Sequence, residues 1–169
     1  MSFFKQFPRT LITVDGNLLN IPDIFRRVGP NKLFDNMAMM NLYDIEDGQK
    51  PEHIAYDVYG SVDYYWLILI CNNIIDPYHD WPKSELDVVE FSKQRYGDDN
   101  LNKVHHYTDS TGKIRVNYDQ TKFNSSAIVA VSNIPHERDT NETKRRIKLP
   151  RPEFIEEISG QFKKLIRGR

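Results

Sequence analysis

The hydrophobic positions of the chain concentrate in one central stretch that contains both of its tryptophans. It reads YGSVDYYWLILICNNIIDPYHDWP, and residues 64–71 carry no charge. Residues 62–73 are apolar at nearly every helical position, a pattern typical of a helix buried on all sides. A membrane-spanning helix needs about 20 apolar residues, and Asp63 and Asp76 enclose far fewer. The pattern therefore predicts the central core helix of a small domain.

The segments on either side of this helix predict an α+β fold. Residues 39–45 alternate loosely between apolar and polar, as a half-buried strand does. Residues 51–59 begin with a proline and place their apolar side chains on one helical face. Gly60 suits the end of that helix, and Ser61 suits the cap of the next one. Residues 145–150, RRIKLP, predict a later strand that its proline stops.

The N-terminal part predicts an extended arm. Asp15-Gly16 lies between two apolar segments, which indicates a β-hairpin. A short helical turn is expected at residues 23–28. Phe3, Phe4 and Phe7 are candidates either for docking on a partner or for folding back onto the chain's own core.

The C-terminal part predicts an amphipathic helix from Glu153 onward. Its acidic residues lie early and its basic residues lie late, which suits the helix dipole. The apolar stripe of this helix either covers the chain's own sheet or meets a partner. It comprises Phe154, Ile155, Ile158, Phe162, Leu165 and Ile166.

The region between the core helix and the RRIKLP strand predicts a second group of elements. It begins as a proline-broken aromatic loop with Tyr78 and Trp81, and Ser84 then suits the cap of a helix that runs to about Tyr96. The remaining expected elements are a hairpin at 104–108 and 113–118, a strand at 127–131, and a polar loop in PHERDTNETK, residues 135–144.

Composition and charge narrow the function classes. The chain has 169 residues, of which 39% are hydrophobic and 28% charged, so we expect one packed domain with an arm or an insertion. The formal net charge is −1, which gives no long-range attraction for nucleic acid or anionic lipid. The C-terminal region is basic, which suits either nucleic acid or an acidic protein neighbour, and we expect a solvated or protein-facing tail. The first residues have no long apolar core, so no signal peptide is expected.

Candidate chemistry is sparse. The single cysteine, Cys71, lies in the apolar run and is expected to be a buried core residue, not a nucleophile. His105 and His106 are adjacent on a predicted strand, where side chains alternate between faces, so a shared metal site is not expected. His79 and Asp80 could form an acid–base pair, but neighbouring residues in a loop seldom converge. Asp76 and Asp80 could flank a glycosidic bond, but their spacing does not give the required separation of the carboxylates. The sequence predicts no catalytic, cofactor-binding or metal-binding residues.

The order of strand, helix, Tyr-Gly, Trp-containing helix, Asn-Asn and late strand is similar to a LysM module. The matching pieces are PEHIAYDVYG, YYWLILICNN and RRIKLP. The resemblance implies a βααβ domain at residues 39–149 that carries a large helix-plus-hairpin insertion at about 74–143. Residues 1–38 are then an N-terminal arm with a short helix, and residues 150–169 a C-terminal amphipathic helix.

A broader resemblance covers most of the chain. IPDIFRRV, the YGSVDYYWLILICNNIIDPYHDWP stretch, SKQRYG and RRIKLPRPEFIEEISGQFKKLIRG together resemble the baseplate wedge protein 53 family of contractile-tailed bacteriophages. The resemblance implies a structural, non-enzymatic subunit without cofactors. It would sit in the virion tail baseplate, be assembled in the host cytoplasm, and occur in several copies in a hexameric assembly. Expected partners are other wedge subunits, neighbouring wedges that close into a ring around the hub, and the sheath-initiating protein, with no membrane or nucleic acid.

An alternative is a LysM-type module that binds peptidoglycan or chitin through the aromatic loop.

If the chain is a baseplate subunit, aromatic and aliphatic side chains are the candidates for a partner interface. They are Phe3, Phe4, Phe7, Tyr64, Tyr65, Tyr78, Trp81, Phe154, Ile158, Phe162 and Leu165.

Overall fold

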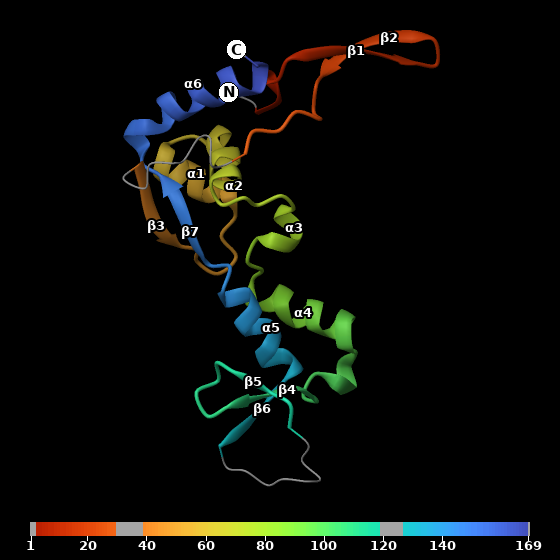
Figure 1. Cartoon of the computed structure of the whole chain (residues 1–169), viewed down its shortest axis with the longest axis vertical. Coiled ribbons are helices and arrows are strands. Elements are labelled where there is room, and N and C mark those ends of the chain that lie inside the picture. The colour runs from red at the N-terminus through yellow and green to blue at the C-terminus, as the bar shows by residue number, and fades with distance from the viewer. Residues whose placement is uncertain (1–2, 30–38, 119–126, 169) are drawn as a thin grey trace. The chain divides into compact units, whose positions relative to one another are not determined.

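The computed structural model describes residues 3–29, 39–118 and 127–168 and contains two compact units (Figure 1). The first unit is formed by residues 1–81 and 146–169, and the second by residues 82–145. The predicted limit of the N-terminal arm, residue 38, lies outside the described residues. Helices and strands are both present, as the sequence predicted for an α+β fold.

The first unit is built on a strand–helix–helix–strand arrangement. Strand β3 (Met40–Asp44) pairs antiparallel with β7 (Arg146–Pro150), so that Tyr43 lies opposite Ile147. Between them in the chain come α1 (Pro51–Tyr59), a 3-10 helix (Val62–Tyr64) and α2 (Tyr65–Cys71). The strands and helices predicted at these places are confirmed.

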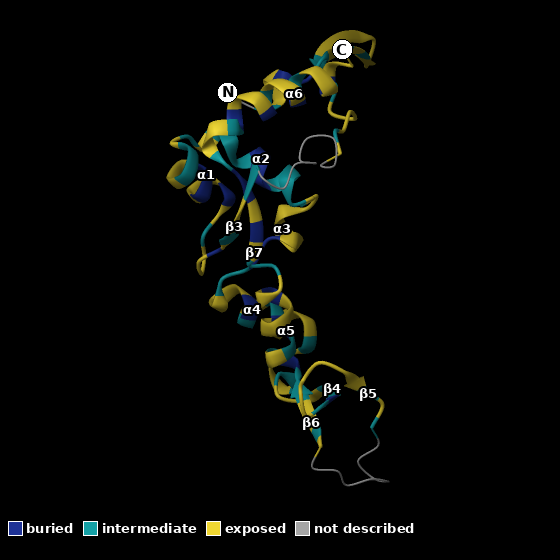
Figure 2. Cartoon of the chain, turned by 60° about the vertical axis from the view of Figure 1, so that its left-hand side comes forward, coloured by how far each residue is buried: buried dark blue, intermediate teal, exposed yellow. Residues whose placement is uncertain are grey.

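Helix α2 lies between two hydrophobic clusters, which makes this unit three layers deep. Ile68 packs with Ile54 of α1 and with Ile147 and Leu149 of β7, while Trp66 packs with α6 on the other side. Figure 1 shows the same order of sheet, α1 with α2, and α6, and Figure 2 shows the buried residues on α2 and β7. The predicted central core helix is therefore confirmed.

The C-terminal helix and the N-terminal residues close the outer layer together. A 3-10 helix (Pro152–Phe154) leads into α6 (Ile155–Arg167), and another 3-10 helix (Phe3–Gln6) begins the described chain. The Trp66 and Phe162 ring centroids lie 4.6 Å apart, and those of Phe3 and Trp66 lie 5.4 Å apart. Arg167 Nε donates to the Gln6 carbonyl at 3.1 Å. Both segments therefore fold onto the chain's own core.

Two local features fix the ends of the central helices. Gly60 ends α1 in the left-handed conformation, φ 72°, which costs glycine little. Asn72 follows α2, and its side-chain amide donates to the Lys148 carbonyl and accepts from the Lys148 N–H, both at 2.8 Å. This amide therefore pairs with the edge of β7 as a neighbouring strand would.

Strands β1 (Arg9–Val14) and β2 (Asn17–Pro22) form a separate antiparallel hairpin in the first unit. The hairpin predicted around Asp15-Gly16 is confirmed. The helical turn predicted at residues 23–28 is wrong, because only Ile24 and Phe25 form a turn and the chain beyond them is not helical.

The second unit combines two helices with a small antiparallel sheet. Helix α4 (Glu85–Tyr96) and strands β4 (Val104–Asp109), β5 (Arg115–Val116) and β6 (Ile128–Ser132) lie close to their predicted positions. The sheet order is β5-β4-β6. The Ser84 side chain accepts from the Asp87 N–H, which confirms the predicted cap of α4.

Two predicted loops contain helices instead. The polar loop predicted at residues 135–144 is wrong, because α5 (Asn133–Glu142) occupies most of it. Its proline, Pro135, lies in the first helical turn, where the missing N–H costs little. The aromatic loop contains the short helix α3 (Pro77–Asp80), capped by the Asp76 side chain.

The interior of the second unit is mainly polar. Val88 and Pro82 are the buried aliphatic side chains in the described part of this unit, and no aromatic side chain of that part is buried. Glu137 is buried and accepts from Tyr96 Oη at 2.6 Å and from Arg95 Nη1 at 3.1 Å. Asn141 accepts from the Lys83 N–H at 2.7 Å and donates to the Lys83 carbonyl at 2.9 Å. Hydrogen bonds, more than apolar packing, define this interior.

We predict that Trp81→Ala lowers the free energy of unfolding by about 3–5 kcal/mol, the range for a buried tryptophan. Trp81 is 7% exposed in the cluster beneath α2, and its Nε1 donates to the Gln49 carbonyl at 2.8 Å. Urea denaturation followed by circular dichroism measures the change. Tyr78→Ala is the matched control, because Tyr78 is 75% exposed and should change stability by about 0.5 kcal/mol or less. Equal effects of the two substitutions would contradict the prediction.

Candidate functional site

The β1–β2 hairpin presents the main group of exposed aliphatic side chains in the first unit. Leu18 is 70% exposed and Leu11 65% exposed, and Val14 and Leu19 are also exposed. Monomeric proteins rarely leave such side chains grouped in water. The hairpin is therefore the candidate protein-binding site.

The tight turn explains why this segment forms a hairpin. Asp15 and Gly16 have φ values of 50° and 79°, as a two-residue hairpin turn with matching strand twist requires. At the base of the hairpin, Arg9 Nε donates to Asn20 Oδ1 at 3.1 Å, and the Asp23 N–H donates to the Pro8 carbonyl at 2.8 Å. The hairpin thus has a fixed register from turn to base.

The register divides the exposed side chains between two faces. Ile12 lies opposite Leu19, which places both on one face, and Thr13 lies opposite Leu18, which places them on the other. Each face is therefore partly apolar, and among the described residues each strand pairs only with the other. A two-stranded hairpin of this kind is marginally stable in water by itself. A protein partner that covers a face or pairs with an edge would stabilise it.

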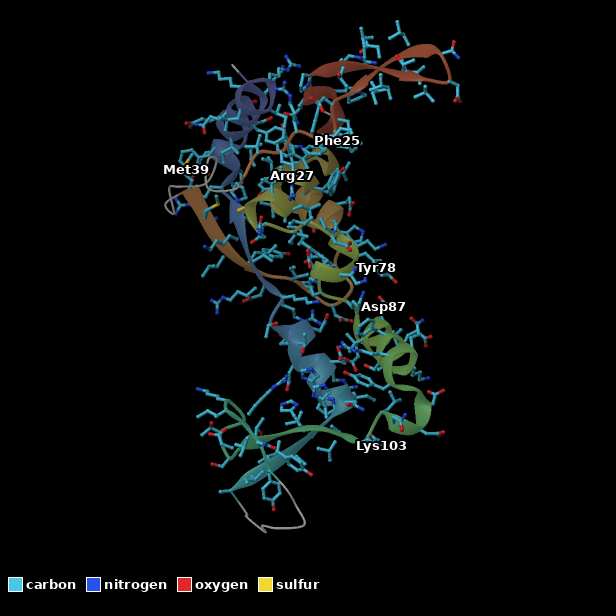
Figure 3. The ribbon with its side chains drawn as sticks, turned by 45° about the vertical axis from the view of Figure 1, so that its right-hand side comes forward. Phe25, Arg27, Met39, Tyr78, Asp87 and Lys103 are labelled. Carbon is cyan, nitrogen blue, oxygen red and sulfur yellow. The ribbon has the colours of Figure 1, made fainter. Side chains whose placement is uncertain are left out.

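The apolar surface continues after the second strand. Ile24 is 56% exposed and Phe25 is 86% exposed. Figure 3 labels Phe25 in the segment that follows the hairpin. Aromatic side chains are enriched in the centres of protein interfaces. Phe25 is therefore a further candidate interface residue, and it was not among those predicted from the sequence.

The structure changes the set of side chains that a partner can reach. Four of the candidate interface residues are buried in the chain's own core, so they are not surface anchors: they are Phe7, Trp81, Ile158 and Phe162. For Phe7 and for the helix residues Ile158 and Phe162, this is the core-packing alternative that the sequence left open. Phe3, Tyr64, Tyr65 and Phe154 are half-buried and pack against the same clusters. Phe4, Tyr78 and Leu165 remain exposed. The buried residues of this set lie in the core because α2 needs apolar neighbours on both of its sides.

A cluster of three histidine side chains lies in the second unit. The side chains of His105, His106 and His136 each offer a ring nitrogen within 4.8 Å of the others. The Nδ1 atoms of His105 and His106 are 2.9 Å apart, and the rings of His105 and His136 stack at 3.9 Å. Burial, followed by nearby positive charge from Arg115, lowers the pKa of His106. Burial likewise lowers the pKa of His136, so both rings favour the neutral form.

The expectation that His105 and His106 point to opposite faces is wrong, and the cause is a β-bulge. Val104 pairs with Ser132 and His106 with Val131, so one extra residue, His105, is inserted into β4. A bulge breaks the alternation of side chains and redirects them. The sequence carries no clear signal for this bulge.

Comparison with known proteins identifies the family. The family model described as "Base plate wedge protein 53" matches residues 3–151. The chain belongs to the baseplate wedge protein 53 family. It is also similar to the baseplate wedge protein gp53 of Enterobacteria phage T4, with 30% identity over 118 residues. That match includes 66% of this chain and spans 59% of the length of the T4 protein.

The family match covers the hairpin, both central helices and the second unit. The name describes a component of a tail structure, and the most exposed apolar surface in the first unit is suited to protein contacts. Among the described residues, no helix is both long enough and apolar enough to cross a membrane. The family match over residues 3–151 confirms the resemblance to this family that the sequence indicated.

Two of the residues considered for catalysis, Asp76 and His79, lie together at the start of α3. His79 Nδ1 lies 2.6 Å from Asp76 Oδ2, an exposed pair that belongs to the α3 cap. The hydrogen bond from His79 lowers the pKa of the Asp76 carboxyl. Cys71 is half-buried and not fully buried as predicted, and its Sγ lies 3.6 Å from Met40 Sδ.

We predict that Cys71 reacts slowly with alkylating reagents. Burial raises the pKa of its thiol to about 12, against a smaller lowering by Lys148. Since an unfolded thiol has a pKa of about 8.5, the folded state favours the protonated form. The stability that this difference contributes is fully present below about pH 8.5, the pKa of the unfolded thiol. It is lost as the pH rises toward the pKa of the folded thiol, about 12.

Iodoacetamide labelling at pH 8 measures this protection. Modification of the native chain should be at least about a hundredfold slower than modification in urea. The chain has one cysteine, so the signal comes from Cys71 alone. Similar rates in the two states would contradict the prediction.

Proposed function

We propose that this chain is a structural, non-catalytic subunit of a phage tail baseplate wedge. In this role it joins larger wedge subunits and helps neighbouring wedges close into a ring around the central hub. It acts in the virion tail, after assembly in the host cytoplasm, with one or more copies in each wedge of a hexameric ring. The observation that carries the proposal is an exposed apolar hairpin in a member of this family.

The hairpin supports this role in two physical ways. Its aliphatic side chains offer a surface whose burial contributes about 25 cal/mol for each Å² removed from water. The outer edges of β1 and β2 can also accept a further strand from a partner, since exposed edges pair readily with other chains. A wedge subunit with an apolar groove or a free strand edge is the partner that this surface fits.

A second contact site supports the joining role. Phe4 is exposed, and it lines a shallow cleft with the basic residues Lys5, Arg9 and Arg167. A partner with an acidic rim and an apolar centre would complement this cleft. Two separate modest contacts to different neighbours give avidity without strong affinity at either one. The sheath-initiating protein is a further candidate partner.

A non-catalytic role agrees with the lining of another cleft in the first unit. It is bordered by apolar side chains of α2 and α6, by Arg26 and Arg27, and by Asn73. No carboxylate, imidazole or thiol lines it, so this cleft lacks a general acid, a general base and a nucleophile.

A LysM-type glycan-binding role is supported less well. The strand–helix–helix–strand order suits such a module, and exposed Tyr78 can stack on a sugar ring. Trp81, the expected second aromatic platform, is buried beneath α2. A single exposed ring gives a weak sugar site.

Co-purification with the neighbouring structural proteins of the phage tests the proposal. We predict that Leu11→Asp combined with Leu18→Asp reduces recovery of wedge subunits at least about tenfold, because a charge on each leucine resists burial. The free energy of unfolding should change by about 0.5 kcal/mol or less, since both leucines are exposed.

Leu86→Asp is the matched control, because Leu86 is 83% exposed but lies in α4 of the second unit. It should leave recovery unchanged. If the hairpin variant and Leu86→Asp reduce recovery of wedge subunits equally, the loss does not come from the hairpin, and the proposal that the hairpin binds them is contradicted. Pelleting of the chain with insoluble peptidoglycan, without recovery of wedge subunits, would favour the LysM-type role.

A further inference from the structure

We propose that His105, His106 and His136 form a binding site for a divalent transition-metal ion of the zinc class. The three rings come from two elements, β4 and α5, and their ring nitrogens lie within 4.8 Å of one another. Zinc binds histidine nitrogen at about 2.0–2.1 Å, and three histidines with one open position form a recognised ligand set. Small rotations of the side chains would bring the three nitrogens around one ion.

The backbone explains why the three rings converge. The bulge between Val104 and His106 breaks the alternation of β4, so two adjacent histidines contribute to one site. His136 stacks on His105 at an interplanar angle of 17° and meets His106 edge-on. Imidazoles are typical ligands for zinc, copper and nickel. The three rings, with His105 close to His106 and stacked on His136, are therefore placed as a chelating set.

The composition of the second unit gives a bound ion a structural use. Apart from Pro82, its described part buries one hydrophobic side chain, Val88, and its interior is held by hydrogen bonds around Glu137 and Asn141. Small units with little apolar core are commonly stabilised by a disulfide or a metal. The only cysteine of the chain lies in the first unit, so a disulfide within the second unit is excluded. An ion at this site would join the sheet to α5.

Two opposite charges act on His106: the positive charge of Arg115, which has the larger effect, and the negative charge of Asp139. Asp139 lies three residues after His136 in α5, on the same helical face. Its carboxylate can partly neutralise a bound cation, and the fourth coordination position is left for water. This site belongs to the second unit and the hairpin to the first, and the proposal does not rest on the proposed assembly role.

Isothermal titration of the full, untagged and chelator-treated chain with zinc chloride tests the proposal. We expect one zinc ion per chain, and a cobalt(II) titration should give the visible absorption bands of a nitrogen-ligated site. His136→Gln should weaken zinc binding at least about tenfold. His79→Gln is the matched control, because His79 lies in the first unit and should leave zinc affinity unchanged.

Thermal unfolding provides a second readout. Zinc should raise the melting temperature of the wild-type chain and of His79→Gln, but not that of His136→Gln, because only binding to the folded state stabilises. His105→Gln and His106→Gln should act as His136→Gln does, so a folding failure of one variant leaves the others decisive. Absence of saturable zinc binding, or equal affinity of the cluster variants and the wild type, would overturn the proposal.

Discussion

Helix α2 has to bury two opposite sides, and the rest of the first unit is arranged around that requirement. Its Ile68 side faces the β3–β7 sheet and α1, while its Trp66 side faces α6. A helix of seven residues is too short to be stable without such packing. The C-terminal helix is therefore an integral layer of this unit, and Phe3 and Phe7 fill the space that remains beside Phe162.

Local signals in the sequence predicted most elements, whereas elements that depend on buried polar groups were missed. The turn at Asp15-Gly16 and the cap at Ser84 act within a few residues, so the sequence alone predicts them. Helix α5 lacks an apolar stripe because it buries Glu137 and Asn141 instead. Hydrophobic periodicity cannot detect a helix of this kind. Its tertiary hydrogen bonds to α4 and Lys83 provide what the sequence pattern lacks.

The candidate interface shows the same limit in another form. Residue type predicted aromatic anchors, but the core takes Phe7 and Trp81 because both sides of α2 need apolar neighbours. The exposed surface is aliphatic and lies on the hairpin. One signal was present in the sequence: apolar residues occupy both faces of the hairpin around Leu11 and Leu19, so no single face serves a core. In this chain, apolar residues on both faces of a hairpin indicate the candidate partner-binding surface better than aromatic residues do.

The two units also differ in what a bound partner or ligand can change. The first unit has two clusters of buried apolar side chains, so its stability follows mainly from apolar packing. The second buries Glu137 against Arg95 and Tyr96, and a buried charge of this kind contributes little net stability even when it is paired. The folding stability of such a unit therefore depends strongly on each interaction that is added within it. The bulge that brings His105 and His106 together therefore lies where one bound ion would have the largest effect on folding.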